Sequence, residues 1–262
     1  ITAALFSKFP YLVIGPTNPT ALVTASVLVA YANQSDFIEF VFAVAIIAGI
    51  FNIIFGLIKL GRITRYISNS VLVGFLTGVG VLVITYQLGN LFGIELLRDS
   101  NLWEVFRQIA SNIPDINLFT LAISVLSFLI LIFIRSVNRK IPAALIAILI
   151  TSFLVYFTNW HENSGVELVS EIGLPNRIPF GFHIPKISLK DFLSLGISGA
   201  AVALFSLMES LSIAKAMSQM TGETLDPSQQ IFSQGIASLV GGFTSCMPSS
   251  ASPSRTVMNV VN

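Results

Sequence analysis

The sequence predicts an all-α polytopic membrane protein. Of its 262 residues, 54% are hydrophobic and only 10% are charged, whereas an ordinary soluble domain is about 25% charged. The charges also cluster, and long stretches without Asp, Glu, Lys or Arg separate the clusters. These stretches are Phe40–Ile58, Tyr66–Ile94, Ile116–Ile134, Ile141–Trp160 and Ile231–Ser254. Each is long enough to cross a hydrocarbon core of about 30 Å as a helix. The alternative, a large soluble protein with buried helices, lacks the polar outer helix face that such proteins show.

The first part of the chain predicts a half-helix and then a full span. Tyr11–Ile14 is a short β-prone run, which Gly15-Pro16 ends. A helix follows over about 19–32, which is too short to cross the membrane alone. The first full span follows at about 40–60.

The middle and last parts of the chain predict further spans. In the middle they lie at about 66–93, 116–134 and 141–157. Between the first two of these, Trp103, Phe106 and Ile109 are spaced for one face of an interfacial helix. A long loop rich in Pro and Gly then leads to spans at about 191–217 and 229–242, and a second half-helix starts at about 253.

The distribution of charge predicts the orientation. Basic connectors at 59–65 and 135–140 are expected on the cytoplasmic side, and acidic loops at 33–39 and 158–171 on the outer side. Both basic connectors fall on one side because two spans separate them.

Two segments interrupt apolar sequence in the same way. Asn18-Pro19-Thr20 matches Ser252-Pro253-Ser254 in residue type and order, and extended chain precedes each. Asn and Ser are good N-caps, and Pro fits the first helical position. Either break alone is explained equally well by a structural kink. As a pair they predict a transport site, because non-helical backbone at membrane depth lies in protein or beside a water-filled cavity.

The chemistry of the paired breaks favours an anion. A helix N-terminus presents free amide donors and about half a positive charge, so two such ends aimed at one point bind negative charge. Arg255 adds a formal charge inside the second half-helix. The candidate substrate-binding residues are Gly15, Pro16, Thr17, Asn18, Thr20, Ser252, Pro253, Ser254 and Arg255.

Glu209 is a second functional candidate, because a carboxylate inside an apolar span is costly. It is expected to carry a coupling proton, to help hold a sodium ion, or to neutralise Arg255. A structural ion pair without a transport role is the alternative.

Several classes of protein are disfavoured. No cofactor beyond a coupling H⁺ or Na⁺ is expected, because the chain has one cysteine, Cys246, and its histidines, His161 and His183, lie in one polar loop where solvation is expected. There is no Ser-His-Asp set, phosphate loop or metal cluster, so an enzyme is not expected. A net charge of +1 gives no indication of a nucleic-acid partner.

At these residues the chain resembles the SulP family, the sulfate-permease-type anion transporters. The resemblance rests on several patches in one order along nearly the whole chain. They are Gly15-Pro16-Thr17, Gly74-Phe75-Leu76-Thr77-Gly78 with Gln87-Leu88, Glu209-Ser210-Leu211-Ser212-Ile213-Ala214-Lys215, Asp226-Pro227-Ser228-Gln229-Gln230, Gly241-Gly242-Phe243 and Ser252-Pro253-Ser254-Arg255-Thr256.

The resemblance implies a fold of fourteen segments in two inverted repeats of seven, of which this chain would supply the third to the start of the tenth. Residues 1–60 and 191–262 would form a mobile core and 61–190 a gate, with the core moving like an elevator. The missing first span would also contribute to the site. The family further implies a homodimer in the plasma or inner membrane and a C-terminal STAS domain, which this fragment lacks.

The function implied is secondary active transport of a small inorganic anion, with sulfate or bicarbonate expected. Many family members have an apolar or aromatic residue where this chain has Thr17, and this difference favours a hydrated oxyanion over a bare halide. A nucleobase or uracil-type transporter of the same general fold and a passive anion channel are the alternatives. Arg255 suits an anion better than a neutral base.

Overall fold

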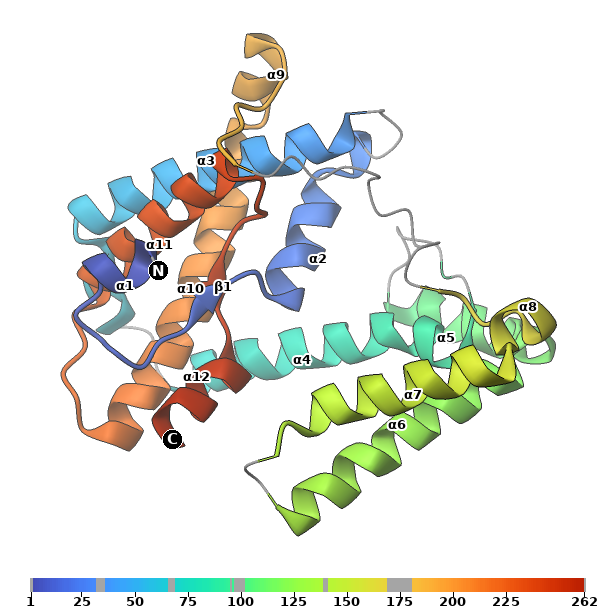
Figure 1. The fold of residues 1–262 in the computed structure, drawn as a ribbon. Coiled ribbons are helices and arrows are strands. Elements are labelled where there is room, and N and C mark those ends of the chain that lie inside the picture. Colours follow the sequence, from blue (N-terminus) through green and yellow to red (C-terminus); the bar gives the residue numbers. More distant parts are fainter. Residues whose placement is uncertain are drawn as a thin grey trace. The chain divides into compact units, whose positions relative to one another are not determined.

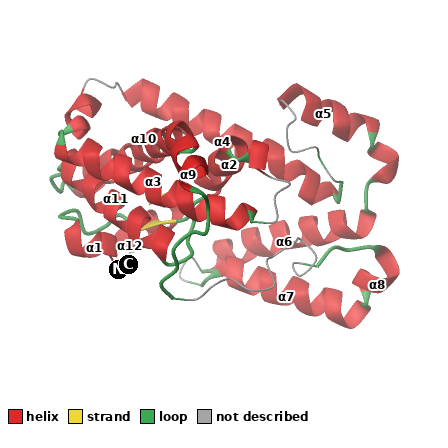
Figure 2. Cartoon of the chain, turned by 90° about the horizontal axis from the view of Figure 1, so that it is seen from above, coloured by secondary structure: helices red, strands yellow, loops and turns green. Residues whose placement is uncertain are grey.

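Helices make up most of the described part of the protein (Figure 2). The structure is a computed structural model, which describes residues 2–31, 36–65, 69–94, 96, 102–138, 141–168 and 181–261. The chain divides into two compact units, residues 1–79 with 177–262 and residues 80–176. The prediction of an all-α protein with two half-helices, each after a short extended segment, is confirmed.

The first unit combines segments from the N-terminal and C-terminal parts of the chain. Its elements are α1 (Thr2–Phe6), β1 (Ile14–Gly15), α2 (Asn18–Val27), η1 (Val29–Tyr31), α3 (Phe37–Leu57), η2 (Leu60–Arg65), α9 (Leu189–Ser194), α10 (Gly196–Thr221), α11 (Pro227–Phe243), β2 (Ser250–Ala251) and α12 (Pro253–Val261). Helix α4 (Asn69–Phe92) starts in this unit and ends in the other.

Helices α3 and α11 pack closely side by side (Figure 1). Glycines on both helices allow their backbones to approach. A Cβ atom added at Gly235 of α11 would lie 2.6 Å from the backbone nitrogen of Ile53, and one at Gly49 of α3 would lie 2.5 Å from that of Leu239. Small residues at helix contacts are the usual route to such close packing inside a membrane.

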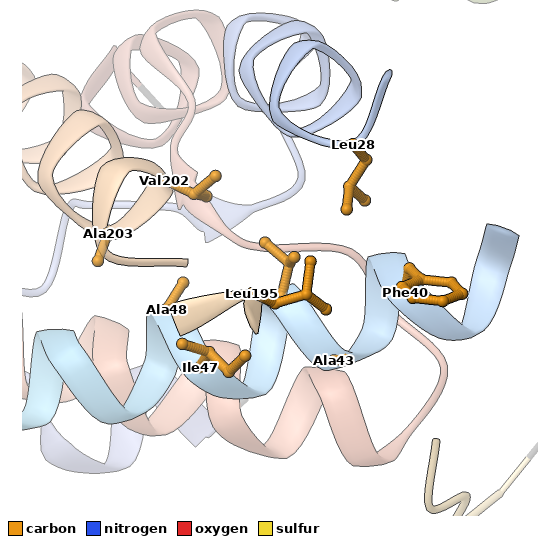
Figure 3. Packing of buried hydrophobic residues seen from close by; sticks show 9 residues of the cluster. Leu28, Phe40, Ala43, Ile47, Ala48, Leu195, Val202 and Ala203 are labelled. Carbon is orange, nitrogen blue, oxygen red and sulfur yellow. The ribbon is translucent and has the colours of Figure 1, made fainter. Parts of the chain in front are cut away.

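A hydrophobic cluster joins α3 to α10 and to the end of α2 (Figure 3). Ala43 and Val202 are fully buried in it, and Phe40 and Leu195 are almost so. Gly199 of α10 lies against Ile47, where an added Cβ would come within 2.3 Å of the isoleucine side chain. These contacts fix α10, and therefore Glu209, relative to the first half-helix.

The second unit is built around two apolar helices. Its elements after α4 are α5 (Leu102–Ser111), η3 (Ile113–Asp115), α6 (Leu118–Val137), α7 (Ala143–Thr158) and α8 (Trp160–Ser164). Asn117 caps α6 by accepting from the amides of Phe119 and Thr120. The side-chain Nδ2 of Asn117 donates to the carbonyl of Ser164, so this residue also ties α6 to the end of α8.

The described helices include three that are long and apolar enough to span a membrane, Phe37–Leu57, Leu118–Val137 and Gly196–Thr221. A shorter apolar helix, Ala143–Thr158, matches the predicted span at 141–157. The spans predicted at 66–93 and 229–242 correspond to α4 and α11.

Some predicted boundaries were wrong. The span predicted at 191–217 is divided, because α9 ends at Ser194 and α10 starts at Gly196, with Leu195 at ψ −5° between them. The half-helix predicted at 19–32 runs from Asn18 to Val27 and ends in a 3₁₀ turn at Val29–Tyr31.

The reading of His183 as a solvated loop residue was also wrong. Its Nε2 lies 2.9 Å from both carboxylate oxygens of Glu39, and its side chain is 17% exposed. The loop after residue 180 therefore folds onto the start of α3. Parts of the predicted connectors, residues 33–35, 139–140 and 169–171, lie outside the described residues.

The compact units differ in extent from the predicted core and gate. They divide the chain after Val79 and before Arg177, whereas the prediction placed the boundaries at 60/61 and 190/191. Helix α5 bears exposed Trp103 and Phe106, in keeping with its amphipathic pattern. The assignments of α5 to the interface and of the units to core and gate remain predictions.

Candidate functional site

A short antiparallel strand pair holds the two half-helices together. Ile14 pairs with Ala251, and Gly15 pairs with Ser250. Because the strands run in opposite directions, the helices that follow them leave in opposite directions, α2 rising and α12 descending in Figure 1. The start of each half-helix therefore lies beside the strand that leads into the other.

Hydrogen bonds extend this pairing into the second half-helix. The amide of Ser252 donates to the carbonyl of Val13 at 3.0 Å. The amide of Val13 in turn donates to Oγ1 of Thr256 at 3.1 Å, and Thr256 is fully buried. The first turn of α12 is thus fixed to the backbone that leads into α2.

The first half-helix starts one residue earlier than predicted. Thr17 is its N-cap, with extended backbone angles, and Oγ1 of Thr17 accepts from the amide of Thr20 at 3.3 Å. Asn18, predicted to be the cap, is the first helical residue, and its side chain is exposed. The threonine is favoured as the cap because its hydroxyl reaches that amide.

Both helix starts keep backbone donors available. Pro253 opens α12 as predicted. In the described part of the chain, no acceptor takes the amide N–H groups of Asn18, Ser254 and Arg255. These amides belong to exposed residues, which is the arrangement that binds anions at helix N-termini.

Arg255 reaches across from the second half-helix to the first. Its Nη2 donates to the carbonyl of Pro16 at 3.1 Å. A Cβ atom at Gly15 would lie 3.2 Å from Nη1 of Arg255, so the absent side chain there leaves room for the guanidinium. Its exposed side chain keeps further N–H donors beside the free amides.

Glu209 lies on the inner side of the same structure and is 2% exposed. Its Oε2 accepts from the hydroxyl of Thr20 at 3.0 Å and lies 3.2 Å from that of Thr17. The side chain of Ser250 also lies beside the carboxylate. Between the described residues Glu209 and Arg255 there is no ion pair, since the guanidinium is directed to the Pro16 carbonyl.

The predicted site residues therefore form two layers. Pro16, Asn18, Pro253, Ser254 and Arg255 are exposed, and Gly15 is half-buried beside them. The buried layer consists of Thr17, Thr20 and Ser252, together with Glu209. The hydroxyls of Thr17 and Thr20 face the carboxylate and not the exposed side.

Several residues that build this site had no role predicted from the sequence. Oγ of Ser210 accepts from the amide of Ala251 at 2.9 Å and lies 3.2 Å from Oγ of Ser250. Asn259 donates to the carbonyl of Tyr11 at 3.0 Å and so ties α12 to the segment that leads into β1. The serine-rich run before Pro253 was the available signal, because small hydroxyl residues there suggest close polar packing.

Comparison with known proteins identifies similar sequences. The profile of the sulfate permease family matches residues 1–262. The putative sulfate transporter YvdB of Bacillus subtilis is 27% identical over 265 residues, which cover 100% of this chain and 48% of the relative. An anion exchange transporter of Homo sapiens is 28% identical, over 93% of this chain and 38% of its own length. The chain thus spans about half or less of these relatives, which are transporters and not enzymes.

Solved structures share the fold. The transmembrane domain of a cyanobacterium bicarbonate transporter, BicA, superposes with a TM-score of 0.80 at 20% identity, over 100% of this chain and 66% of that one. The murine Slc26a9 anion transporter in the inward-facing state gives 0.79 at 15% identity, over 99% of this chain and 48% of that one. With its apolar helices, this chain is a multi-pass membrane protein.

Proposed function

The chain belongs to the sulfate permease family, and from that premise we propose that it serves secondary active transport of a small inorganic anion, sulfate or bicarbonate. The named relatives are a putative sulfate transporter and an anion exchange transporter, and a structural neighbour is a bicarbonate transporter.

The observation that carries this proposal is the group of donors on the exposed layer. Free amides of Asn18 and Ser254 and the guanidinium of Arg255 lie at or beside the starts of two half-helices. All of these groups donate hydrogen bonds, and the helix ends add partial positive charge. A tetrahedral or planar oxyanion offers several acceptor oxygens to such a group, whereas a neutral nucleobase requires acceptors as well as donors.

Glu209 supplies a physical basis for coupling. Its carboxylate already lies at the N-terminal end of α2, held by the cap residue Thr17 and by Thr20. A substrate anion at the outer side of the same helix end would meet like charge across a short, poorly hydrated distance. A proton or a sodium ion at Glu209 removes that repulsion, so anion binding and cation binding favour each other. We therefore assign the coupling H⁺ or Na⁺ to this carboxylate.

The transport movement we propose assigns residues 1–60 and 191–262 to the core and 61–190 to the gate. Both half-helices and Glu209 belong to one compact unit, and this supports a site that moves as one body. We propose an elevator-like movement of that body in a homodimer of the complete transporter, as the family resemblance implies.

Uptake by the complete transporter in liposomes tests the function. Labelled sulfate, bicarbonate, chloride and uracil are supplied with and without imposed H⁺ and Na⁺ gradients. Accumulation of an oxyanion against its gradient, driven by one cation, is expected. Uracil uptake would favour the nucleobase alternative, and anion flux that never exceeds equilibrium would identify a passive channel.

A further inference from the structure

A ring of packed segments, joined by buried polar contacts and by one packing contact, lies behind Glu209. Asn52 of α3 donates from Nδ2 to Oγ of Ser206 on α10 at 3.2 Å. Helix α10 is tied to β2, where Oγ of Ser250 lies 3.4 Å from the Ser206 carbonyl oxygen. Ser249 precedes Ser250 in the chain, and its carbonyl oxygen accepts from Nε2 of Gln234 on α11 at 3.1 Å. The ring closes because α11 packs against α3 at this level, where Gly235 meets Ile53.

Solvent does not reach the ring. Asn52 is 0% exposed, Gln234 and Ser206 are 1% exposed, and Ser249 is 7% exposed. Polar groups buried to this degree carry a free-energy cost unless each is hydrogen-bonded.

The neighbours of the two amide side chains fix their orientation. The hydroxyl of Ser206 donates to the carbonyl of Ala203 at 3.0 Å, so it can only accept from Asn52. The Nδ2 atom must therefore face Ser206. The partner of Gln234 is a carbonyl oxygen, which only accepts, so its Nε2 must face Ser249.

Both amide oxygens are consequently left without a donor. In the described part of the chain, no hydrogen bond reaches Oδ1 of Asn52 or Oε1 of Gln234. Oγ of Ser238 lies 2.7 Å from Oγ of Ser249 and accepts from the Ser249 amide. In the described part of the chain, neither hydroxyl is hydrogen-bonded to Oδ1 of Asn52 or to Oε1 of Gln234. Rotating either amide to exchange its oxygen and nitrogen would break a bond that the ring already makes.

We propose that the ring binds one water molecule, which donates to Oδ1 of Asn52 and to Oε1 of Gln234. A water molecule has two O–H donors, and the ring has two acceptors that lack them. Buried waters typically serve groups of this kind. A sodium ion fits less well, because no carboxylate contacts either oxygen in the described part of the chain, and so its charge would lack an adjacent counter-charge.

The water ties α3 to the backbone that leads into the second half-helix. Ser249 and Ser250 form one wall of the ring, and Ser250 also contacts the carboxylate of Glu209. Asn52 would therefore support the position of β2 and the start of α12 without touching the substrate. This consequence for transport rests on the proposed function, whereas the water itself does not.

A structure of the complete transporter at about 2 Å resolution tests the water directly. We expect a density peak at about 2.7–3.0 Å from both amide oxygens. The proposal is overturned by a ring without a peak, or by one in which each oxygen meets a protein donor. A peak coordinated by several oxygens at about 2.4 Å, as hard cations are, would replace the water with an ion.

A double-variant cycle gives an independent test. Asn52→Leu and Gln234→Met keep the side-chain shape and remove the acceptors. If one water serves both, the loss of thermal midpoint in the double variant is smaller than the sum of the two single losses. Ser233→Ala is the matched control, because Ser233 is fully buried on the same helix and its hydroxyl donates to the carbonyl of Gln230. The loss of thermal midpoint caused by Ser233→Ala should simply add to that caused by Asn52→Leu. If the losses caused by Asn52→Leu and Gln234→Met are additive as well, a shared water is contradicted.

Measuring anion uptake shows whether Asn52 supports transport or only the stability of the fold. At temperatures where the variant stays folded, Asn52→Leu should raise the KM for the anion several-fold, and Ser233→Ala should leave it unchanged. An unchanged KM in both would remove the link to transport while leaving the structural result in place.

Discussion

Replacing Arg255 with alanine is expected to weaken anion binding about tenfold. The guanidinium is exposed, and its Nη2 donates to the carbonyl of Pro16 at 3.1 Å. A hydrogen bond to a charged partner contributes about 1.5–3 kcal/mol, but exposure and screening favour the lower end of that range. Because about 1.4 kcal/mol corresponds to a factor of ten, 1.5 kcal/mol predicts a rise in KM of roughly tenfold.

The assay is uptake of labelled anion by the complete transporter in liposomes, with KM and maximal rate measured separately. Arg255→Lys is the matched control, because lysine keeps the charge but lacks the planar fork that binds two oxygens at once. We expect its KM to lie between those of the wild type and the alanine variant. A KM for Arg255→Ala within twofold of the wild type, in protein that inserts and elutes normally, would refute the assignment of this residue to the site.

Three further outcomes follow from the same structure. Glu209→Gln should abolish the dependence of uptake on the driving H⁺ or Na⁺ gradient, and a retained gradient dependence would exclude the carboxylate as the coupling group. Gly235→Ala should lower the thermal midpoint, because its Cβ would lie 2.6 Å from the α3 backbone. Overpacking of this kind costs about 1–3 kcal/mol. Gly196→Ala is the control, because no atom lies within 4 Å of the Cβ that it adds. Gly15→Ala should raise KM roughly 2- to 12-fold by displacing Arg255, since an off-rotamer side chain costs about 0.5–1.5 kcal/mol; an unchanged KM would show that the guanidinium adapts freely.

Local chemistry made the half-helices predictable from the sequence. Asn18-Pro19 and Ser252-Pro253 combine cap-forming residues with proline, and helix starts depend on a few neighbouring residues. The structure therefore differs by only one residue at the first start and agrees at the second. The spans at α3, α6 and α10 were predictable for a similar reason, since hydropathy selects these helices.

Contacts between distant segments were not predictable in the same way. The partners of Glu209 come from α2 and β2, about 190 residues before it and 40 after it in the chain, and nothing in the local sequence around Glu209 specifies them. For the same reason, the sequence left open whether Glu209 neutralises Arg255, which the geometry answers by directing the guanidinium to Pro16. The pairing of His183 with Glu39 likewise depends on a loop that folds across α3.

The two layers of the site meet at one peptide unit, which joins Pro16 to Thr17. On the exposed side, the carbonyl of Pro16 accepts from Arg255. On the buried side, Oγ1 of Thr17 lies 3.2 Å from the carboxylate of Glu209. In the proposed function, proton or sodium binding at Glu209 would change what the Thr17 hydroxyl contacts. A resulting shift of Thr17 would also move the planar peptide that joins it to Pro16. We therefore propose that this peptide couples the cation to the anion.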